Sequence, residues 1–177
     1  MTTDTSLTST LEPTRRPNAK FMWSHPAHII ALGFGSGLSR FAPGTAGTLW
    51  AWLTFWLLQD HMNDSRWAVL IAASFLIGWW VCTLTAKNLQ IADPGSIVWD
   101  EIVAFWLILW LIAPTGFWGQ WVAFALFRYF DAAKPGPVAW ADKTFKGFGA
   151  RGGFGIMFDD LVAAFCTLLV MAVWRFV

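Results

Sequence analysis

Five apolar runs, separated by short polar connectors, constrain the fold of this chain more than any other feature of its sequence. The runs cover about Thr45–Leu58, Trp67–Ala86, Ile97–Ala113, Phe117–Phe130 and Ile156–Phe176. Several are shorter than the roughly 20 residues that a helix needs to cross a bilayer, so some are expected to be partly embedded or extended by their flanks. No β-alternation stands out along the chain. The pattern therefore predicts an all-α protein.

The composition favours a membrane protein over a soluble domain. Hydrophobic residues make up 56% of the 177 residues, and only 13% are charged, about half the ordinary share. A soluble domain of this size could hardly bury 14 Trp residues with so few charges. Trp and Phe also cluster near the ends of the runs, as in an interfacial belt. We predict an integral membrane helical bundle with about four to five apolar helices. The net charge of +1 gives no reason to expect a nucleic-acid partner.

The segment before the first run is predicted to lie outside the bilayer. Residues 1–20 are polar, rich in Thr and interrupted by Pro, and they lack the apolar core of a signal peptide. We predict that they form a disordered tail. Phe21–Leu32 is apolar and aromatic but too short to cross, so we predict an interfacial segment there. Residues 21–177 are then expected to form a single membrane-embedded domain.

The basic residues predict which side of the membrane the polar helix ends face. If all five runs cross, these ends lie on one face, together with ten of the twelve Lys and Arg residues. Arg66 and Arg175 lie on the other face. Because cytoplasmic loops carry an excess of Lys and Arg, the polar face is predicted to be cytoplasmic. If one short run re-enters instead of crossing, the C-terminus changes side, but the polar ends still converge in part.

The acidic residues at these helix ends suggest a metal site. They form three sets: Asp93, Asp100 and Glu101; Asp131; Asp159 and Asp160. Helix capping explains one or two of them, because carboxylates favour helix N-termini. It does not explain Asp131 at a predicted C-terminal end, nor paired acids beside apolar residues. Oxygen-rich clusters suit a hard cation, Mg²⁺ before Ca²⁺ or Zn²⁺. Capping combined with salt bridges is the alternative.

A glycine-rich segment, "GFGSGLSRFAPGTAGTL", precedes the first run and is a candidate phosphate site. It matches the dinucleotide-binding pattern weakly, and no strand precedes it. Exposed amides, hydroxyl groups and an arginine before a helix N-terminus suit a phosphate. A plain turn at the membrane surface is the alternative. The candidate ligands here are Gly35, Ser36, Gly37, Arg40 and Thr45.

A basic segment between Phe127 and Asp160 is a second candidate anion site. Arg128 and Asp131 are three residues apart on a predicted helix and can pair with each other. Four further cations follow: Lys134, Lys143, Lys146 and Arg151. They are either ordinary positive-inside charges or an electropositive lid for an anionic headgroup.

Other phosphatase chemistries are not indicated by the sequence. Cys82 and Cys166 sit inside apolar runs, and neither begins a Cys-x5-Arg loop. The three His residues form no arrangement typical of histidine-based lipid phosphatases. A phosphatase with this sequence is therefore expected to use a metal and water.

Four motifs together resemble the phosphatidylglycerophosphatase A family of bacterial inner-membrane lipid phosphatases. They are "GFGSGLSRFAPGTAGTL", "DPGSIVWDE", "FRYFDAAKPGPV" and "GGFGIMFDD", in the family's order, and they cover about Gly33 to Asp160. Arg40 stands where many relatives are expected to have Pro. The resemblance implies an all-helical bundle that hydrolyses the phosphomonoester of phosphatidylglycerophosphate with Mg²⁺, in phospholipid biosynthesis. It also implies a multi-pass protein of the bacterial inner membrane, with a phospholipid substrate and a site facing the cytoplasm.

The resemblance and the patterns above lead to a set of expected site residues. The expected catalytic residues are Asp100, Glu101, Asp131 and Lys134. The expected metal ligands are Asp93, Asp100, Glu101, Asp131, Asp159 and Asp160. The expected substrate-binding residues are Gly35, Ser36, Gly37, Arg40, Thr45, Arg128 and Lys143.

Two other functions are compatible with a small membrane protein of this kind. A transporter or channel would spread its acids through the membrane depth, whereas these acids lie at helix ends. A purely structural membrane partner would show no Mg²⁺-dependent phosphate release.

Overall fold

The computed structural model describes residues 16–176, and all of its regular elements are helical. Most of the predicted disordered tail, residues 1–15, lies outside the described residues, as does Val177. The elements are α1 (Ala19–Trp23), α2 (Pro26–Ala31), η1 (Gly33–Leu38), α3 (Pro43–Leu58), η2 (Gln59–His61), α4 (Asp64–Leu89), α5 (Trp99–Ile112), α6 (Phe117–Ala133), α7 (Pro137–Phe145) and α8 (Ala150–Phe176). The predicted all-α class is confirmed over this range.

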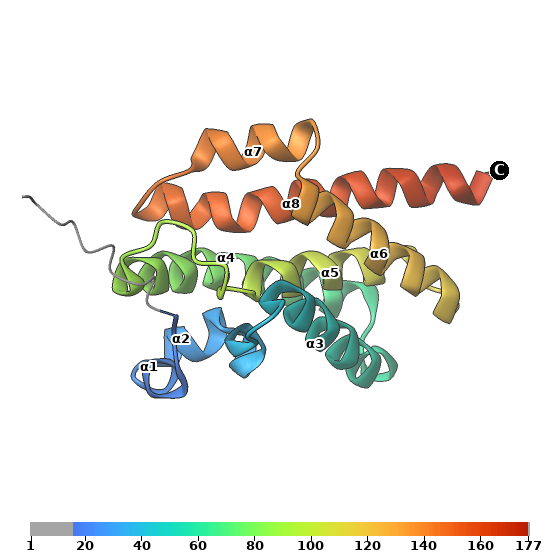
Figure 1. Cartoon of the computed structure of the whole chain (residues 1–177). Coiled ribbons are helices and arrows are strands. Elements are labelled where there is room, and N and C mark those ends of the chain that lie inside the picture. The colour runs from blue at the N-terminus through green and yellow to red at the C-terminus, as the bar shows by residue number, and fades with distance from the viewer. Residues whose placement is uncertain (1–15, 177) are drawn as a thin grey trace, which may run out of the picture.

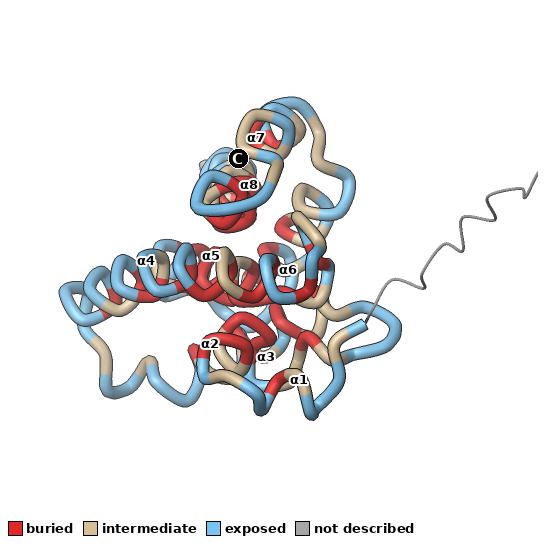
Figure 2. Tube along the Cα trace, turned by 90° about the vertical axis from the view of Figure 1, so that its left-hand side faces the viewer, coloured by how far each residue is buried: buried red, intermediate tan, exposed pale blue. Residues whose placement is uncertain are grey.

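The helices stack in layers around α5. α7 and α8 form one outer layer, α4 and α5 the middle layer, and α1 to α3 the other outer layer (Figures 1 and 2). α5 packs against α8, α3 and α4 and is apolar and buried on nearly every side, as expected for a core helix. Its large aromatic side chains satisfy their polar atoms: the indole N–H of Trp99 donates to the carbonyl of Ser74, and that of Trp106 donates to the carbonyl of Ala51, both at 3.0 Å.

Two helices, α4 and α8, are long and apolar enough to cross a membrane. Their outer faces carry large exposed apolar side chains, among them Leu76 and Trp80 on α4 and Phe165 and Leu169 on α8. Exposed apolar surface of this kind fits contact with lipid, and together with the length of the two helices it indicates a membrane protein. The other three predicted runs form α3, α5 and α6, with 16, 14 and 17 residues. They are shorter than a full span, so the crossing of four to five helices stays a prediction.

The start of α8 differs from the prediction. The sequence placed Asp159 and Asp160 at the beginning of the last helix, but α8 begins at Ala150, so both acids lie well inside it. Gly153 and Gly155, which precede these acids, are helical in the structure. A Cβ at Gly153 would collide with Thr83, and one at Gly155 would collide with Phe145, so both positions require glycine. These glycines allow close helix packing.

The predicted interfacial segment folds into two short helices. α2 packs against α4, and His28 is buried there with its Nδ1 2.9 Å from the hydroxyl of Thr85. Trp23 at the end of α1 remains exposed. The segment is therefore partly packed on the protein, and its place at the membrane surface stays a prediction. α1 begins at Ala19, capped by Asn18, inside the last residues of the predicted tail.

Candidate active site

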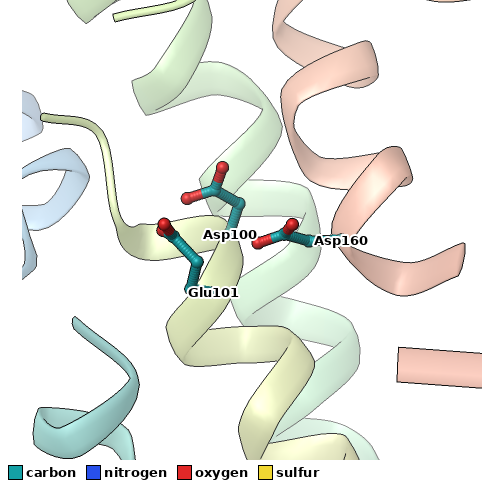
Figure 3. Close-up of side chains that lie close together, drawn as sticks. All are labelled: Asp100, Glu101 and Asp160. Carbon is teal, nitrogen blue, oxygen red and sulfur yellow. The ribbon is translucent and has the colours of Figure 1, made fainter. Parts of the chain in front are cut away.

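Three carboxylates from two helices converge at the middle of the bundle. Asp100 and Glu101 lie in the first turn of α5, and Asp160 reaches them from α8 (Figure 3). One oxygen from each of the three lies within 4.8 Å of the others. We call Asp100, Glu101 and Asp160 the open cluster, because each has a buried oxygen with no hydrogen-bond partner among the described residues: Asp100 Oδ1, Glu101 Oε2 and Asp160 Oδ2.

The open cluster fits one hard cation. Buried carboxylate oxygens without a partner cost free energy, so three of them side by side require a compensating charge. A cation bound at about 2.0–2.6 Å brings ligand oxygens up to about 4–5 Å apart, which is the size of this cluster. All three donors are oxygen atoms, the ligand type that Mg²⁺ and Ca²⁺ prefer.

α6 adds a cation and a fourth carboxylate to the rim of the open cluster. Arg128 forms an ion pair with Asp131, as the i,i+3 spacing predicted, and its Nη1 lies 3.9 Å from Glu101 Oε1. Asp131 therefore adjoins the open cluster through Arg128. The structure thus brings together five of the residues expected from the sequence: Asp100, Glu101, Arg128, Asp131 and Asp160.

The N-terminus of α3 abuts this rim. A Cβ on Gly44 would collide with Glu101 and come within 3.0 Å of both terminal nitrogens of Arg128, so only glycine leaves room here. The first backbone hydrogen bond of α3 runs from Ala46 N to the carbonyl of Ala42, at 3.0 Å. The amides of Gly44 and Thr45 precede it and are free to bind an anion. The importance of Gly44 was not foreseen, although its place directly after Pro43 at a helix start was a usable signal.

A second group of charged side chains is fully paired, and we call it the closed cluster. Lys134 Nζ lies 2.5 Å from Asp159 Oδ2 and 2.7 Å from Asp142 Oδ1, while Lys146 Nζ lies 3.5 Å from Asp142 Oδ2. Asp142 was not among the predicted site residues, although the i,i+4 spacing between Asp142 and Lys146 was a usable signal. Lys134 itself ends α6 with φ 44°, a left-handed conformation uncommon for lysine.

The ion pairs of the closed cluster shift the pKa values of its members. Burial alone would lower the pKa of Lys134, but the charge of Asp159 and the hydrogen bonds that Lys134 donates to Asp142 and Asp159 outweigh it and raise that pKa. Burial alone would raise the pKa of Asp142, but the hydrogen bond and charge of Lys134 lower it. Both groups are therefore held in their charged forms.

The remaining expected site residues lie around this centre, or apart from it. Asp93 is exposed in the loop before α5 and lines two pockets, one with Asp142 and Asp159, the other with Gly37 and Arg40.

The hydroxyl of Ser36 donates to the carbonyl of Gly33 at 2.8 Å within η1. Gly37 lies against the backbone of Ser96, and Gly35 faces Met22. Lys143 is exposed on α7. The structure shows no contact of Gly35, Ser36 or Lys143 with the open cluster among the described residues.

Comparisons with known proteins agree on one family. A family model described as Phosphatidylglycerophosphatase A matches residues 29–175. The chain is 42% identical over 147 residues to the Phosphatidylglycerophosphatase A of Escherichia coli K12, covering 82% of this chain and 81% of that protein. It is 39% identical over 157 residues to the Haemophilus influenzae protein of the same name, covering 88% and 92%.

A third relative has a different name. The chain is 36% identical over 156 residues to a putative phosphatidylinositol-3-phosphatase of Bacteroides thetaiotaomicron, covering 84% of this chain and 93% of that protein. No solved structure gives a significant match.

Proposed function

The chain belongs to the phosphatidylglycerophosphatase A family of phosphatases, and from this membership and the geometry of the open cluster we propose that it removes the terminal phosphate of phosphatidylglycerophosphate in a Mg²⁺-dependent reaction. The product, phosphatidylglycerol, makes this a step of phospholipid biosynthesis. The observation that carries the proposal is the open cluster itself: three carboxylates, each with a buried oxygen that has no partner among the described residues, beside an arginine and the amides of a helix N-terminus.

Asp100, Glu101 and Asp160 would hold the metal, with Asp131 at its edge. Bound there, Mg²⁺ would supply positive charge to the phosphoryl oxygens and acidify a water molecule. The oxygen of the attacking water forms a bond to phosphorus while the ester bond to the glycerol oxygen breaks. A carboxylate of the cluster with a free oxygen accepts the proton of the water and passes it to the leaving glycerol oxygen, which departs as a hydroxyl group.

Arg128 and the N-terminus of α3 would hold the phosphate. The guanidinium lies beside Glu101 and Gly44, so a phosphate near the open cluster meets both its donors and the amides of Gly44 and Thr45. The charge that develops on the transferring phosphoryl group is stabilised by donors that are already in place. Lys134 has a different role in this arrangement: it forms ion pairs with both Asp159 and Asp142 and so fixes α7 against α8 beside the site.

One relative suggests a competing substrate. The Bacteroides relative is named for phosphatidylinositol 3-phosphate, so that lipid is the natural comparison. The transporter alternative is less well supported, because Asp160, although it lies well inside α8, meets Asp100 and Glu101 in the first turn of α5, so these acids gather in one cluster.

Phosphate release by the purified full-length protein tests the proposal. We expect release from phosphatidylglycerophosphate with Mg²⁺, loss of release with a chelator, and slower release from phosphatidylinositol 3-phosphate. Faster turnover of phosphatidylinositol 3-phosphate would mean that the inositol lipid, and not phosphatidylglycerophosphate, is the preferred substrate. Absence of Mg²⁺-dependent release from either lipid would refute the proposal.

We further propose that the protein is multi-pass in the bacterial inner membrane with the site facing the cytoplasm, as the distribution of basic residues predicts. Lys146 is the largely exposed member of the closed cluster and is a suitable position for a label that reports the orientation. In a background without Cys82 and Cys166, Lys146→Cys should resist an impermeant thiol reagent in intact cells and react in inverted vesicles. Labelling in intact cells would reverse the orientation.

A further inference from the structure

A pocket of about 680 Å³ lies between the N-terminal segment, η1 and the loop before α5. This volume is in the range of small-ligand sites. Two residues of its lining connect the pocket to the surroundings of the candidate active site. Pro43, which lines it, is followed directly by Gly44 of the α3 N-terminus, and Asp93 lines both this pocket and the one that contains Asp142 and Asp159.

The charges of this pocket favour an anion. Arg16 and Arg40 both line it, and Arg16 Nη1 donates to the backbone carbonyl of Arg40 at 3.4 Å. This contact leaves the guanidinium of Arg40 unused, since no hydrogen bond or ion pair of that side chain is found among the described residues. Asp93 is the single acidic residue in the lining, so the pocket carries a positive balance. Ser96, also in the lining, has a buried hydroxyl with no partner in the described part of the chain.

The rim of the pocket has the character of a membrane interface. Phe41 follows Arg40 directly, lines the pocket and is 98% exposed. Phe34 on η1 and Trp23 at the end of α1 are also largely exposed nearby in the chain. Exposed aromatic side chains beside arginine are typical of the level at which lipid headgroups meet acyl chains.

We propose that this pocket, through Arg16 and Arg40, binds the inner phosphodiester of the lipid headgroup while the terminal phosphomonoester occupies the open cluster. The inference rests on the proposed function. The substrate has two phosphates joined by a glycerol, and the inner one is closer to the acyl chains. The cationic pocket has exposed aromatic side chains at its rim, and the open cluster is the candidate metal site. The two sites therefore match an inner phosphate near the acyl chains and a terminal phosphate farther from them. The pocket would then select lipid phosphates that carry an inner phosphodiester.

The test compares two inhibitors that each carry one half of this recognition. Soluble short-chain phosphatidylglycerol has the phosphodiester alone, and orthophosphate resembles the terminal group alone. Both are titrated against hydrolysis of short-chain phosphatidylglycerophosphate by full-length protein in neutral detergent, so no anionic surface is present. The variants are Arg40→Gln, Arg16→Gln and Arg40→Lys. Lys87→Gln removes an exposed charge outside the pocket lining and serves as the control.

Arg40→Gln should raise the KM for the substrate and the inhibition constant of phosphatidylglycerol about tenfold, with less than about a twofold change for orthophosphate. Arg16→Gln should act in the same direction, Arg40→Lys should retain part of the affinity, and Lys87→Gln should change neither constant.

Equal increases for both inhibitors would overturn the proposal, because Arg40 would then act on the terminal phosphate or on the fold. Unchanged constants in both arginine variants would overturn it as well, and so would a defect that appears only with anionic vesicles, which would assign the pocket to bulk lipid. These results differ from a wild-type protein that releases no phosphate, which would refute the proposed function itself.

Discussion

Asp159 and Asp160 are neighbours on α8, yet their side chains join clusters of opposite electrostatic character. Asp160 belongs to the open cluster, where three carboxylates leave buried oxygens without partners. Asp159 belongs to the closed cluster, where Lys134 pairs with two carboxylates at 2.5 and 2.7 Å and Lys146 supplies the second positive charge. Successive residues of a helix are about 100° apart, so adjacent acids face different neighbours.

The difference separates a site that needs a ligand from one that satisfies itself. A cluster with excess buried negative charge is costly in the absence of a cation and is therefore a candidate for function. A cluster with matched charges is complete without a ligand and chiefly positions its helices. Both Lys134 and Asp142 are held in the charged form. Because folding raises the pKa of Lys134, its charged form stabilises the fold fully at a pH below the pKa of lysine in the unfolded chain. Because folding lowers the pKa of Asp142, its charged form stabilises the fold fully at a pH above the pKa of aspartate in the unfolded chain. Both contributions are therefore present at neutral pH.

The largest expected effect separates the two neighbouring aspartates. Asp160→Asn should lower Mg²⁺-dependent phosphate release by about 10²–10³-fold, because it removes a charged ligand from the open cluster. Its metal-free unfolding temperature should stay equal or rise, since one of three like charges is gone. Asp159→Asn should lower that temperature and reduce turnover less. Equal losses of turnover would place Asp159 among the metal ligands and break the comparison.

Metal binding should stabilise the protein through the open cluster alone. At a Mg²⁺ concentration of about 100 times Kd, wild-type protein should gain about 2.7 kcal/mol in unfolding free energy. Asp100→Asn should lose this gain, whereas Asp142→Asn, in the closed cluster, should keep it. Thermal unfolding with Mg²⁺ or with a chelator measures both. If Asp100→Asn retained the full gain in unfolding free energy, the metal would bind at a site other than the open cluster.

The two lysines of the closed cluster should differ in their effect on stability. Lys134→Ala removes the partner of Asp159 and the closer of the two partners of Asp142, and should cost about 1.5–3 kcal/mol of unfolding free energy. Turnover should fall with it, because α7 and α8 lose their alignment beside the site. Lys146 is largely exposed and pairs at 3.5 Å, so Lys146→Ala should cost at most about 0.5 kcal/mol. Denaturant unfolding and phosphate release check the pair, and similar small effects would mean that Lys134 is only a topological charge.

The smallest expected effect concerns the wall between α3 and the open cluster. Gly44→Ala should lower kcat/KM about threefold to tenfold, because its methyl group displaces Glu101 or Arg128. Gly116→Ala is the matched control, since a Cβ there meets nothing within 4 Å and Gly116 does not line the pocket that contains Arg40. Michaelis–Menten kinetics of both variants provide the measurement. If both variants behaved like the wild type, the contact of α3 with the rim would have no role in catalysis.

The sequence by itself determined the helical class, indicated the membrane character and placed Asp131 correctly at the end of a helix. Apolar runs and the shortage of charge are local properties, and so is the Arg128–Asp131 pair, which follows from a three-residue spacing on one helix. The motif order also pointed to the family that the comparisons then showed. Asp100 and Glu101 were identified correctly at the start of an apolar helix.

Only the tertiary structure decided which of these charges meet. The start of α8 at Ala150 depended on glycines that fit against Thr83 and Phe145, contacts between segments distant in the chain. The separation of Asp159 from Asp160 depended on where α5 and α7 pack against α8. Local spacing fixes which face of a helix a side chain occupies, but helix packing selects what that face meets, and this selection made one acid a partner of lysine and left its neighbour open to a cation.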